Sequence, residues 1–133
     1  MRLCYGLLLA SIAACGGSST GYGGNPPPPP PPPAPPPAPG TVFVTISEYQ
    51  FRPDTITIAK STPVRWTNAG TVSHTATADN GSFDSGTLDG TGPDPYGNPM
   101  QGGKYDHTFT TAGTFTYYCM FHAQMHGTVI VTP

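Results

Sequence analysis

Charged residues are scarce in this 133-residue sequence, and no stretch of it is strongly basic. Only 9% of the residues are charged, and residues 41–133 carry four basic against seven acidic side chains, a formal net charge of −3. A nucleic-acid surface requires lysine and arginine clustered on one face. The composition therefore excludes nucleic-acid binding.

Helical periodicity of useful length is also missing. Runs of Val, Ile, Thr, Phe and Tyr instead recur about every ten residues, separated by Gly, Pro, Asn and Asp. This spacing is typical of an all-β sandwich or barrel. The predicted strands are Val42–Ser47, Thr55–Ala59, Val64–Asn68, His74–Ala78, Lys104–Thr110, Thr114–Cys119 and Thr128–Thr132, and a long Gly- and Pro-rich loop is predicted between Asp89 and Gly103.

Cysteine is rare, with three residues in the whole sequence. Cys4 lies in an apolar leader and Cys15 at the end of that leader, so the folded part keeps a single thiol, Cys119. One thiol cannot form an internal disulfide. In an oxidising compartment a free thiol is a liability unless something occupies it.

The first 14 residues have the pattern of a secretory signal peptide. Met1 and Arg2 precede an apolar run, from Leu3 to Ala14, that is too short to span a bilayer. The run ends in Ile-Ala-Ala-Cys, which resembles the lipobox of bacterial lipoproteins, where cleavage before the cysteine leaves a lipid on its sulfur. We interpret residues 1–14 as a lipoprotein signal peptide and Cys15 as the lipidated residue, with an ordinary signal peptide as the alternative.

Residues 15–40 form a low-complexity linker. A Gly/Ser-rich stretch comes first, and a proline-rich stretch from Pro26 to Pro39 follows. Consecutive prolines favour an extended helix of about 3.1 Å per residue, so this stretch could reach about 40 Å. We predict a disordered, Pro-rich spacer that holds a domain away from a membrane; a ligand for Pro-binding domains is the alternative.

Residues 41–133 are enough for one small domain. Strand alternation places Phe115, Tyr117 and Cys119 on one face, which directs the Cys119 thiol toward the interior. The same alternation places His107 between Tyr105 and Phe109 on an apolar face. We therefore interpret His107 as a structural residue.

Soft and borderline metal donors are concentrated in the segment CMFHAQMHG. Cys119 is followed by His122 and Met125, and the thiolate and thioether exclude a hard-cation site such as calcium or magnesium. A structural zinc site is disfavoured, because it takes four Cys or His ligands and hardly ever a thioether. Two histidines, one cysteine and a weak axial methionine form a blue copper centre. One further histidine is therefore needed.

His74 is the best candidate for that ligand, because it lies where a turn meets a predicted strand and can reach a loop at the same end of a sandwich. His126 directly follows Met125 and would point away from it in extended backbone. We therefore expect His126 to face solvent.

The segments around these candidate ligands also resemble those of a known protein family. Residues 41–133 resemble the cupredoxins, in particular the plastocyanin and amicyanin group, and the Cys-x2-His-x2-Met loop has the short, amicyanin-like form. The matching segments are Val64-Arg-Trp66-Thr-Asn68, His74-Thr75, Phe83-Asp-Ser85-Gly-Thr-Leu88, Tyr105 with Thr108-Phe109, Gly113-Thr-Phe115-Thr-Tyr117-Tyr-Cys119 and His122-Ala-Gln-Met125-His-Gly127-Thr-Val129.

The resemblance implies a Greek-key β-sandwich that holds one type 1 copper. It implies that the copper lies in a plane with His74, Cys119 and His122, with Met125 as the long axial ligand. Two residues, Asn68 and Thr75, would lie just outside the ligands, and hydrogen bonds of Asn68 would tie the loop before His74 to the Cys119 loop.

The resemblance also implies that the His122 ring edge emerges through an apolar patch where a redox partner docks. Candidates for the patch are Phe121, Ala123 and Gln124; Met100 fits loop filler better. The sequence departs from the family pattern at three places. Met120-Phe121 replaces the common Thr-Pro, Ala76 replaces a bulkier aliphatic residue, and Ser61-Thr62-Pro63 replaces a Gly-centred turn.

A metal with four protein ligands has no open position for substrate, so we expect a single-electron carrier and not an enzyme. A copper oxidase needs many more histidines than the four present, and a nitrite reductase needs a second copper. Copper delivery or storage is the alternative, and it would favour an exposed site rich in Met or Cys. The expected partners are a redox donor and acceptor, such as a cytochrome or a copper or quinoprotein enzyme, with the chain a monomer.

The expected location is extracytoplasmic. Gly16 after the lipidated cysteine is no inner-membrane retention signal under the usual Gram-negative sorting rule, which favours an outer-membrane anchor facing the periplasm. A Gram-positive cell surface is the alternative.

Overall fold

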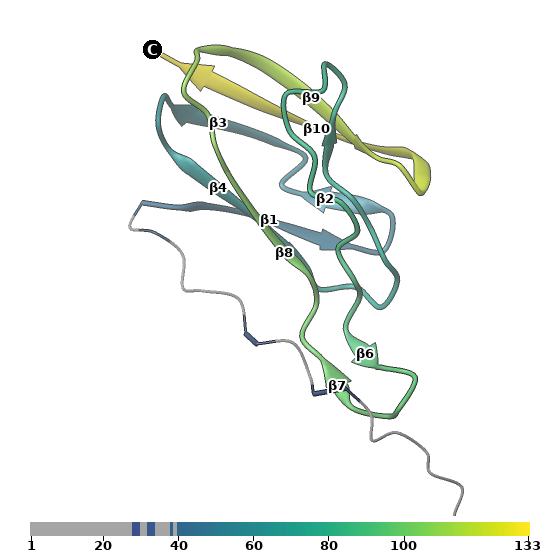
Figure 1. Ribbon diagram of the computed structural model, residues 1–133. Helices are drawn as coiled ribbons and strands as arrows, with labels where there is room; N and C mark the ends of the chain where they lie inside the picture. Colours follow the sequence, from purple (N-terminus) through teal and green to yellow (C-terminus); the bar gives the residue numbers. More distant parts are fainter. Residues whose placement is uncertain (1–27, 30–31, 34–37, 39) are drawn as a thin grey trace, which may run out of the picture.

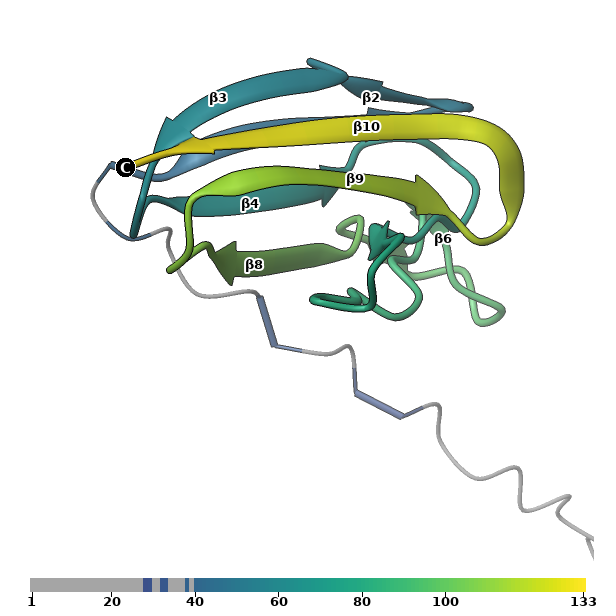
Figure 2. The same cartoon turned by 90° about the horizontal axis from the view of Figure 1, so that it is seen from above.

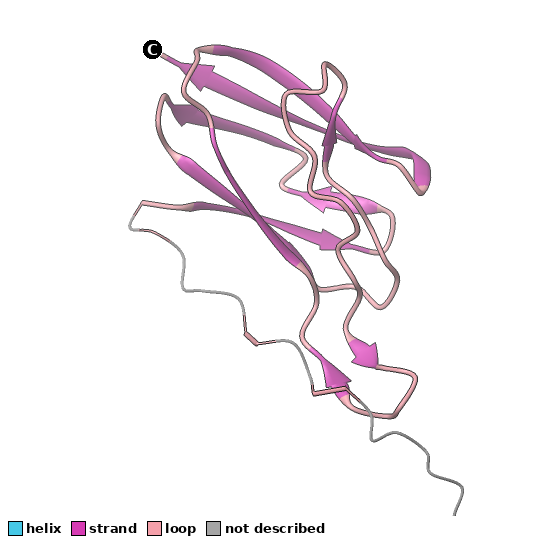
Figure 3. Cartoon of the chain, viewed as in Figure 1, coloured by secondary structure: helices cyan, strands magenta, loops and turns pink. Residues whose placement is uncertain are grey.

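The computed structural model describes residues 28–29, 32–33, 38 and 40–133. The predicted signal peptide, Cys15 and most of the predicted linker lie outside the described residues. The part that is described consists of strands and loops, without a helix (Figure 3), so it also holds no helix that could cross a bilayer. The strands are β1 (Val42–Ser47), β2 (Gln50–Arg52), β3 (Thr55–Ala59), β4 (Pro63–Asn68), β5 (Thr77–Ala78), β6 (Gly92–Pro93), β7 (Pro99–Met100), β8 (Lys104–Thr108), β9 (Gly113–Cys119) and β10 (His122–Thr132).

Two four-stranded sheets form a β-sandwich (Figures 1 and 2), as predicted. One sheet has the order β2-β1-β4-β8 and the other β3-β10-β9-β5. Within them β1 pairs with β4 and β3 with β10 in parallel, whereas the other pairs are antiparallel. Sequential strands repeatedly change sheet, as in Greek-key sandwiches.

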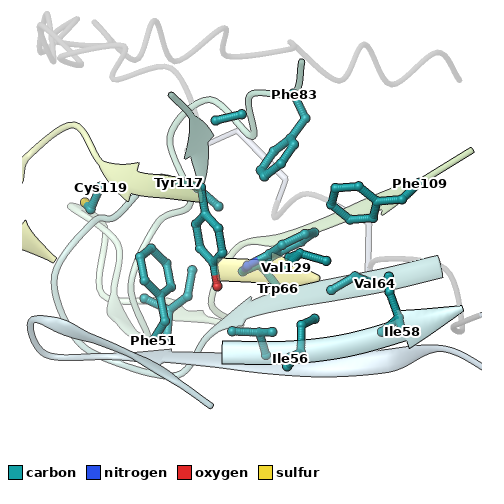
Figure 4. Close-up of a cluster of buried hydrophobic side chains, with 14 of the residues drawn as sticks. Phe51, Ile56, Ile58, Val64, Trp66, Phe83, Phe109, Tyr117, Cys119 and Val129 are labelled. Atoms are coloured by element: carbon teal, nitrogen blue, oxygen red, sulfur yellow. The ribbon is translucent and has the colours of Figure 1, made fainter. Parts of the chain in front are cut away.

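Alternate residues of the strands fill the space between the sheets. In β3 the side chains of Ile56 and Ile58 are buried and their threonine neighbours exposed, which follows from the two-residue period of a strand. Trp66 of β4 meets Tyr117 of β9 at the centre, with ring centroids 5.7 Å apart and planes nearly perpendicular (Figure 4). Burial of apolar side chains such as these rings is the main favourable contribution to the fold.

The predicted strand His74–Ala78 is mostly irregular. Only Thr77–Ala78 forms β5, while His74 pairs with Leu88 in an isolated bridge. The amide of Ala76 donates to the hydroxyl of Ser85, which lies in another segment, instead of to a strand carbonyl. Side chain–backbone bonds of this kind compete with a regular ladder.

Other boundaries also differ from the prediction. Strand β2 was missed, because three residues show no periodicity, and β8 ends two residues earlier than predicted. Strand β10 begins at His122 and not at Thr128, because the segment after Cys119 already pairs with β9 through a register shift. The long loop holds a small hairpin, β6–β7.

Candidate metal centre

Three of the predicted donors converge at one end of the sandwich. His74 lies in the irregular segment before β5, Cys119 ends β9 and His122 begins β10. The Nδ1 atoms of the two histidines are 3.1 Å apart, and the Cys119 Sγ lies 3.4 Å from Nδ1 of His122 and 3.7 Å from Nδ1 of His74. One small triangle therefore holds two imidazole nitrogens and a thiol.

These distances fit a single metal ion. Metal–nitrogen bonds of about 2.0–2.1 Å and metal–sulfur bonds of about 2.3 Å place donors on one ion roughly 3–4 Å apart. All three separations lie in that range. The donor set, two imidazoles and a thiolate, suits copper or zinc but no hard cation.

The residues of the site differ in how far they are exposed to solvent. The side chains of His74, Cys119 and Met125 are buried, whereas His122 is partly exposed. Met125 belongs to the same group and adds a thioether, which favours copper over zinc. Only the His122 ring therefore connects the site with solvent.

Met125 and His126 lie at the register shift in β10 and differ in burial, with Met125 buried and His126 exposed. Pairing with β9 is interrupted between His122 and His126, which makes room for the loop that carries Met125. His126 is exposed, and its Nε2 lies 2.9 Å from the carbonyl oxygen of Ala123. The structure therefore brings Met125 into the site and leaves His126 outside it.

Burial lowers the pKa of His74, and the neighbouring His122 ring lowers it further. A neutral imidazole offers the lone pair that a metal needs. The Nε2 atom of His74 has no hydrogen-bond partner among the described residues. Packing, and not a bond from Nε2, therefore sets the orientation of this ring.

Asn68 and Thr75, the two residues predicted to lie just outside the ligands, form hydrogen bonds with different segments. The amide group of Asn68 donates to the carbonyls of Val72 and Leu88, at 2.8 and 2.9 Å, and its Oδ1 accepts the amide of Gly70 at 3.0 Å. These bonds fix the loop before His74, but they do not reach the Cys119 loop as the resemblance implied.

Thr75 makes that link instead. Its amide donates to the Sγ of Cys119 at 3.3 Å, and its hydroxyl accepts the amide of Met120 at 2.9 Å. The segment of His74 and the segment of Cys119 are therefore joined through Thr75, as is usual for groups that orient metal ligands.

The surface around His122 is partly apolar. Phe121 is 53% exposed, and Ala123 and Gln124 are exposed beside it. Met100 is also exposed, but it lies in β7 and lines a groove with prolines of the linker and residues of the β6–β7 hairpin. His107 is half-buried between the rings of Phe83 and Phe109, in the structural position expected for it.

Sequence reasoning missed Tyr49. Its ring lies nearly perpendicular to that of His122, with centroids 4.9 Å apart, and 6.4 Å from that of His74. Tyr49 precedes a three-residue strand that was itself unrecognised. Nothing in its local sequence signals a contact with residues so far along the chain.

Comparison with known proteins agrees with this geometry. The model of the copper-binding plastocyanin/azurin family matches residues 40–132. No curated protein sequence matches the chain significantly. Cupredoxins are electron-transfer proteins and not enzymes.

Solved structures of the same kind resemble the chain. The novel purple cupredoxin of Nitrosopumilus maritimus is 26% identical with a TM-score of 0.56, covering 68% of this chain and 99% of that one. A mutant amicyanin in its reduced state is 28% identical with a TM-score of 0.54, covering 71% and 85%. A mutant fern plastocyanin, 24% identical with a TM-score of 0.55 and covering 68% and 100%, shares the fold. The chain therefore belongs to the plastocyanin/azurin family of copper-binding proteins, the cupredoxins.

Proposed function

We propose that the protein is a membrane-tethered type 1 blue copper protein that carries single electrons between redox partners outside the cytoplasm. Copper binding and electron transfer follow from the family. The ligands we assign are His74, Cys119, His122 and Met125. The observation that carries this assignment is the triangle of two imidazole nitrogens and one thiol, buried except at the His122 ring.

When bound, copper supplies a one-electron couple between Cu(II) and Cu(I). The chain's own residues do the rest. Cys119 would bind as a thiolate, and the amide of Thr75 donates a hydrogen bond to its sulfur. The buried His74 and Met125 help to exclude water. Strands β9 and β10 are paired around the site and would hold the ligands in place in either oxidation state.

The exposed edge of His122 provides the route for the electron. It is the one assigned ligand that reaches solvent, and Phe121, Ala123 and Gln124 are exposed next to it. An apolar surface of this kind can bind a partner briefly while the copper stays covered. We propose that a redox protein such as a cytochrome or a copper or quinoprotein enzyme docks here.

Copper delivery or storage is the competing function. Transfer of copper to a receiving protein requires donors that the receiver can reach, whereas the Cys119 thiol is completely buried. Burial of the thiol therefore favours electron transfer. A copper oxidase or nitrite reductase would need further histidines or a second copper site, and four histidines do not supply them.

Visible spectroscopy of the copper-loaded protein tests the assignment. We expect an intense thiolate-to-Cu(II) absorption band that a mild reductant bleaches reversibly, that Cys119→Ser abolishes, and that His126→Ala leaves intact. A colourless protein that gives up copper readily to a chelator would instead support delivery. Loss of the band in His126→Ala would contradict the ligand set.

The tether rests on the sequence of residues 1–40. We propose that Cys15 carries the lipid, that the Pro-rich linker spaces the monomeric domain from the outer membrane, and that the domain faces the periplasm. In cells that express the full chain, Cys15→Ala should move the protein from the membrane to the soluble fraction, while Cys119→Ser should not. Retention of Cys15→Ala in the membrane would rule out the lipid anchor.

A further inference from the structure

His122 is the proposed ligand with the least support from the core. His74 is enclosed on all sides, whereas His122 is partly exposed at the start of β10. Its ring is therefore less enclosed than that of His74, and contacts on its exposed side matter for its orientation. Two aromatic rings lie next to it, the buried His74 with its centroid 4.7 Å away and the exposed Tyr49 at 4.9 Å.

Tyr49 adopts an unusual backbone conformation. Its φ of +64° lies in the left-handed region, which bulky side chains seldom enter. A residue stays there only when its surroundings hold it, and such residues cluster at functional sites. Two-residue hairpin turns accommodate a positive φ, and contacts outside the turn between β1 and β2 can help to hold Tyr49 there.

The neighbouring Glu48 fixes the turn to the loop that leads into His74. Its Oε1 accepts hydrogen bonds from the amide and the hydroxyl of Thr71. Gly70 leaves room for this contact, because a Cβ there would lie 2.8 Å from the same oxygen. Two hydrogen bonds from Thr71 to Glu48 therefore hold the turn beside the metal site, and the absence of a side chain at Gly70 makes this contact possible.

The Tyr49 ring is directed at the ligands and not at the core. It is 51% exposed, so burial alone does not explain its position. It lies edge-on to His122 with centroids 4.9 Å apart and to His74 at 6.4 Å, with interplanar angles of 80° and 75°. Perpendicular aromatic pairs at these distances attract each other.

We propose that Tyr49 is a positioning residue that holds the His122 ring in its metal-binding orientation before the metal arrives. The inference rests on the proposed function, because His122 must be a copper ligand for the orientation to matter. A ring that is already in place loses less freedom on binding, so the pair should slow the release of copper. In this proposal the contact with Tyr49 fixes the orientation of the His122 ring, whereas burial fixes that of the His74 ring.

The test uses three variants of the full-length protein. Tyr49→Asn removes the ring with a residue that tolerates the left-handed region. Tyr49→Phe keeps the ring and removes the hydroxyl. Tyr96→Asn is the matched control, because Tyr96 is a 62% exposed tyrosine outside the metal site, in the loop between β6 and β7.

The first measurement is made on the metal-free protein. NMR relaxation of the His122 ring should show an ordered side chain in the wild type, Tyr49→Phe and Tyr96→Asn, and a mobile one in Tyr49→Asn. An equally ordered His122 ring in Tyr49→Asn would overturn the proposal. Mobility in Tyr49→Phe would also overturn it, since the ring contact would not then be the cause.

The second measurement follows the transfer of Cu(I) from the loaded protein to a chelator. We expect Tyr49→Asn to release copper about two- to tenfold faster than the wild type, the range that one aromatic pair allows. The two controls should release it at the wild-type rate. An unchanged rate of copper release in Tyr49→Asn would overturn the proposal. If the wild-type protein forms no blue copper site, the proposed function is contradicted. In that case the NMR measurement alone tests the role of Tyr49.

Discussion

The amide of Thr75 and the Sγ of Cys119 lie 3.3 Å apart, although 44 positions separate the two residues in the sequence. The Thr75 hydroxyl extends the link by accepting the Met120 amide at 2.9 Å. Thr75 itself is buried. The segment that carries His74 is thus attached to the segment that carries the thiol through Thr75, which donates one hydrogen bond and accepts another.

Replacement of Thr75 by valine should therefore lower the free energy of unfolding but leave the visible absorption band of the copper form in place. The Met120 amide would lose its acceptor, and an unpaired, partly buried donor costs about 1–3 kcal/mol. The amide of residue 75 would still reach the sulfur, so the absorption band of the copper form should persist. Urea unfolding of the metal-free protein measures the loss. Thr45→Val, on the exposed face of β1, should change the free energy of unfolding by less than about 0.5 kcal/mol.

Gly127 is a site where even one methyl group should be harmful. A Cβ at this position would lie 2.2 Å from a ring carbon of Tyr117, whose ring is fully buried. Because that ring cannot move without disturbing Trp66, we expect Gly127→Ala to lower the free energy of unfolding by about 3 kcal/mol. Gly92→Ala is the control, since a Cβ there meets nothing within 4 Å. Equal midpoints of urea unfolding for the two variants would refute the expected clash.

Arg65 and Asp106 form a two-pronged ion pair between β4 and β8, with both N–O distances 2.6 Å. The Arg65 side chain is 6% exposed and that of Asp106 48%. Asp106→Asn should leave a covered guanidinium without its counter-charge. Solvent screening at the exposed partner limits the loss to about 1 kcal/mol at pH 7.

The same pair predicts a pH dependence. Hydrogen bonds from Arg65 hold the pKa of Asp106 below its usual value. A carboxylate with a lowered pKa stabilises the fold above its unfolded pKa, about 3.9, and this contribution is lost as the pH falls through the lower folded value. The difference between wild type and Asp106→Asn should therefore be full at pH 7 and shrink in acid. A constant difference in urea unfolding from pH 7 to about pH 3 would contradict this sign.

Copper should stabilise the fold as a cross-link would. The proposed ligands His74 and Cys119 are 45 positions apart, so one ion closes a long loop that the unfolded chain leaves open. We expect calorimetry to show a higher Tm for the copper-loaded protein than for the metal-free protein. Cys119→Ser, without the thiolate, should show little shift when copper is added.

Strands with clear alternation could be predicted from the sequence. In Thr55–Ala59 the alternation of threonine and isoleucine matches the observed exposure and burial residue by residue. The proposed ligands Cys119, His122 and Met125 could be singled out because they are close in sequence and chemically distinctive. His74 could be proposed because, of the four histidines, it lies where a turn meets a predicted strand.

Features that depend on distant contacts could not be predicted. The irregular course of His74–Ala78 depends on Ser85, which takes the place of a strand partner. The site of Tyr49 depends on a backbone angle that no local pattern signals and on Glu48 reaching Thr71. In both cases a side chain from another segment decides the conformation.

The pairing of β10 has a consequence for the order of events during maturation. This strand carries His122 and Met125, and it also joins β3 in parallel, with Thr128 opposite Thr55. Pairings between such distant segments form slowly, because the entropy of closing a long loop comes before the contacts that offset it. Until β10 has paired, two of the four proposed ligands, His122 and Met125, are not in their final places. We therefore expect the protein to bind copper after it has folded.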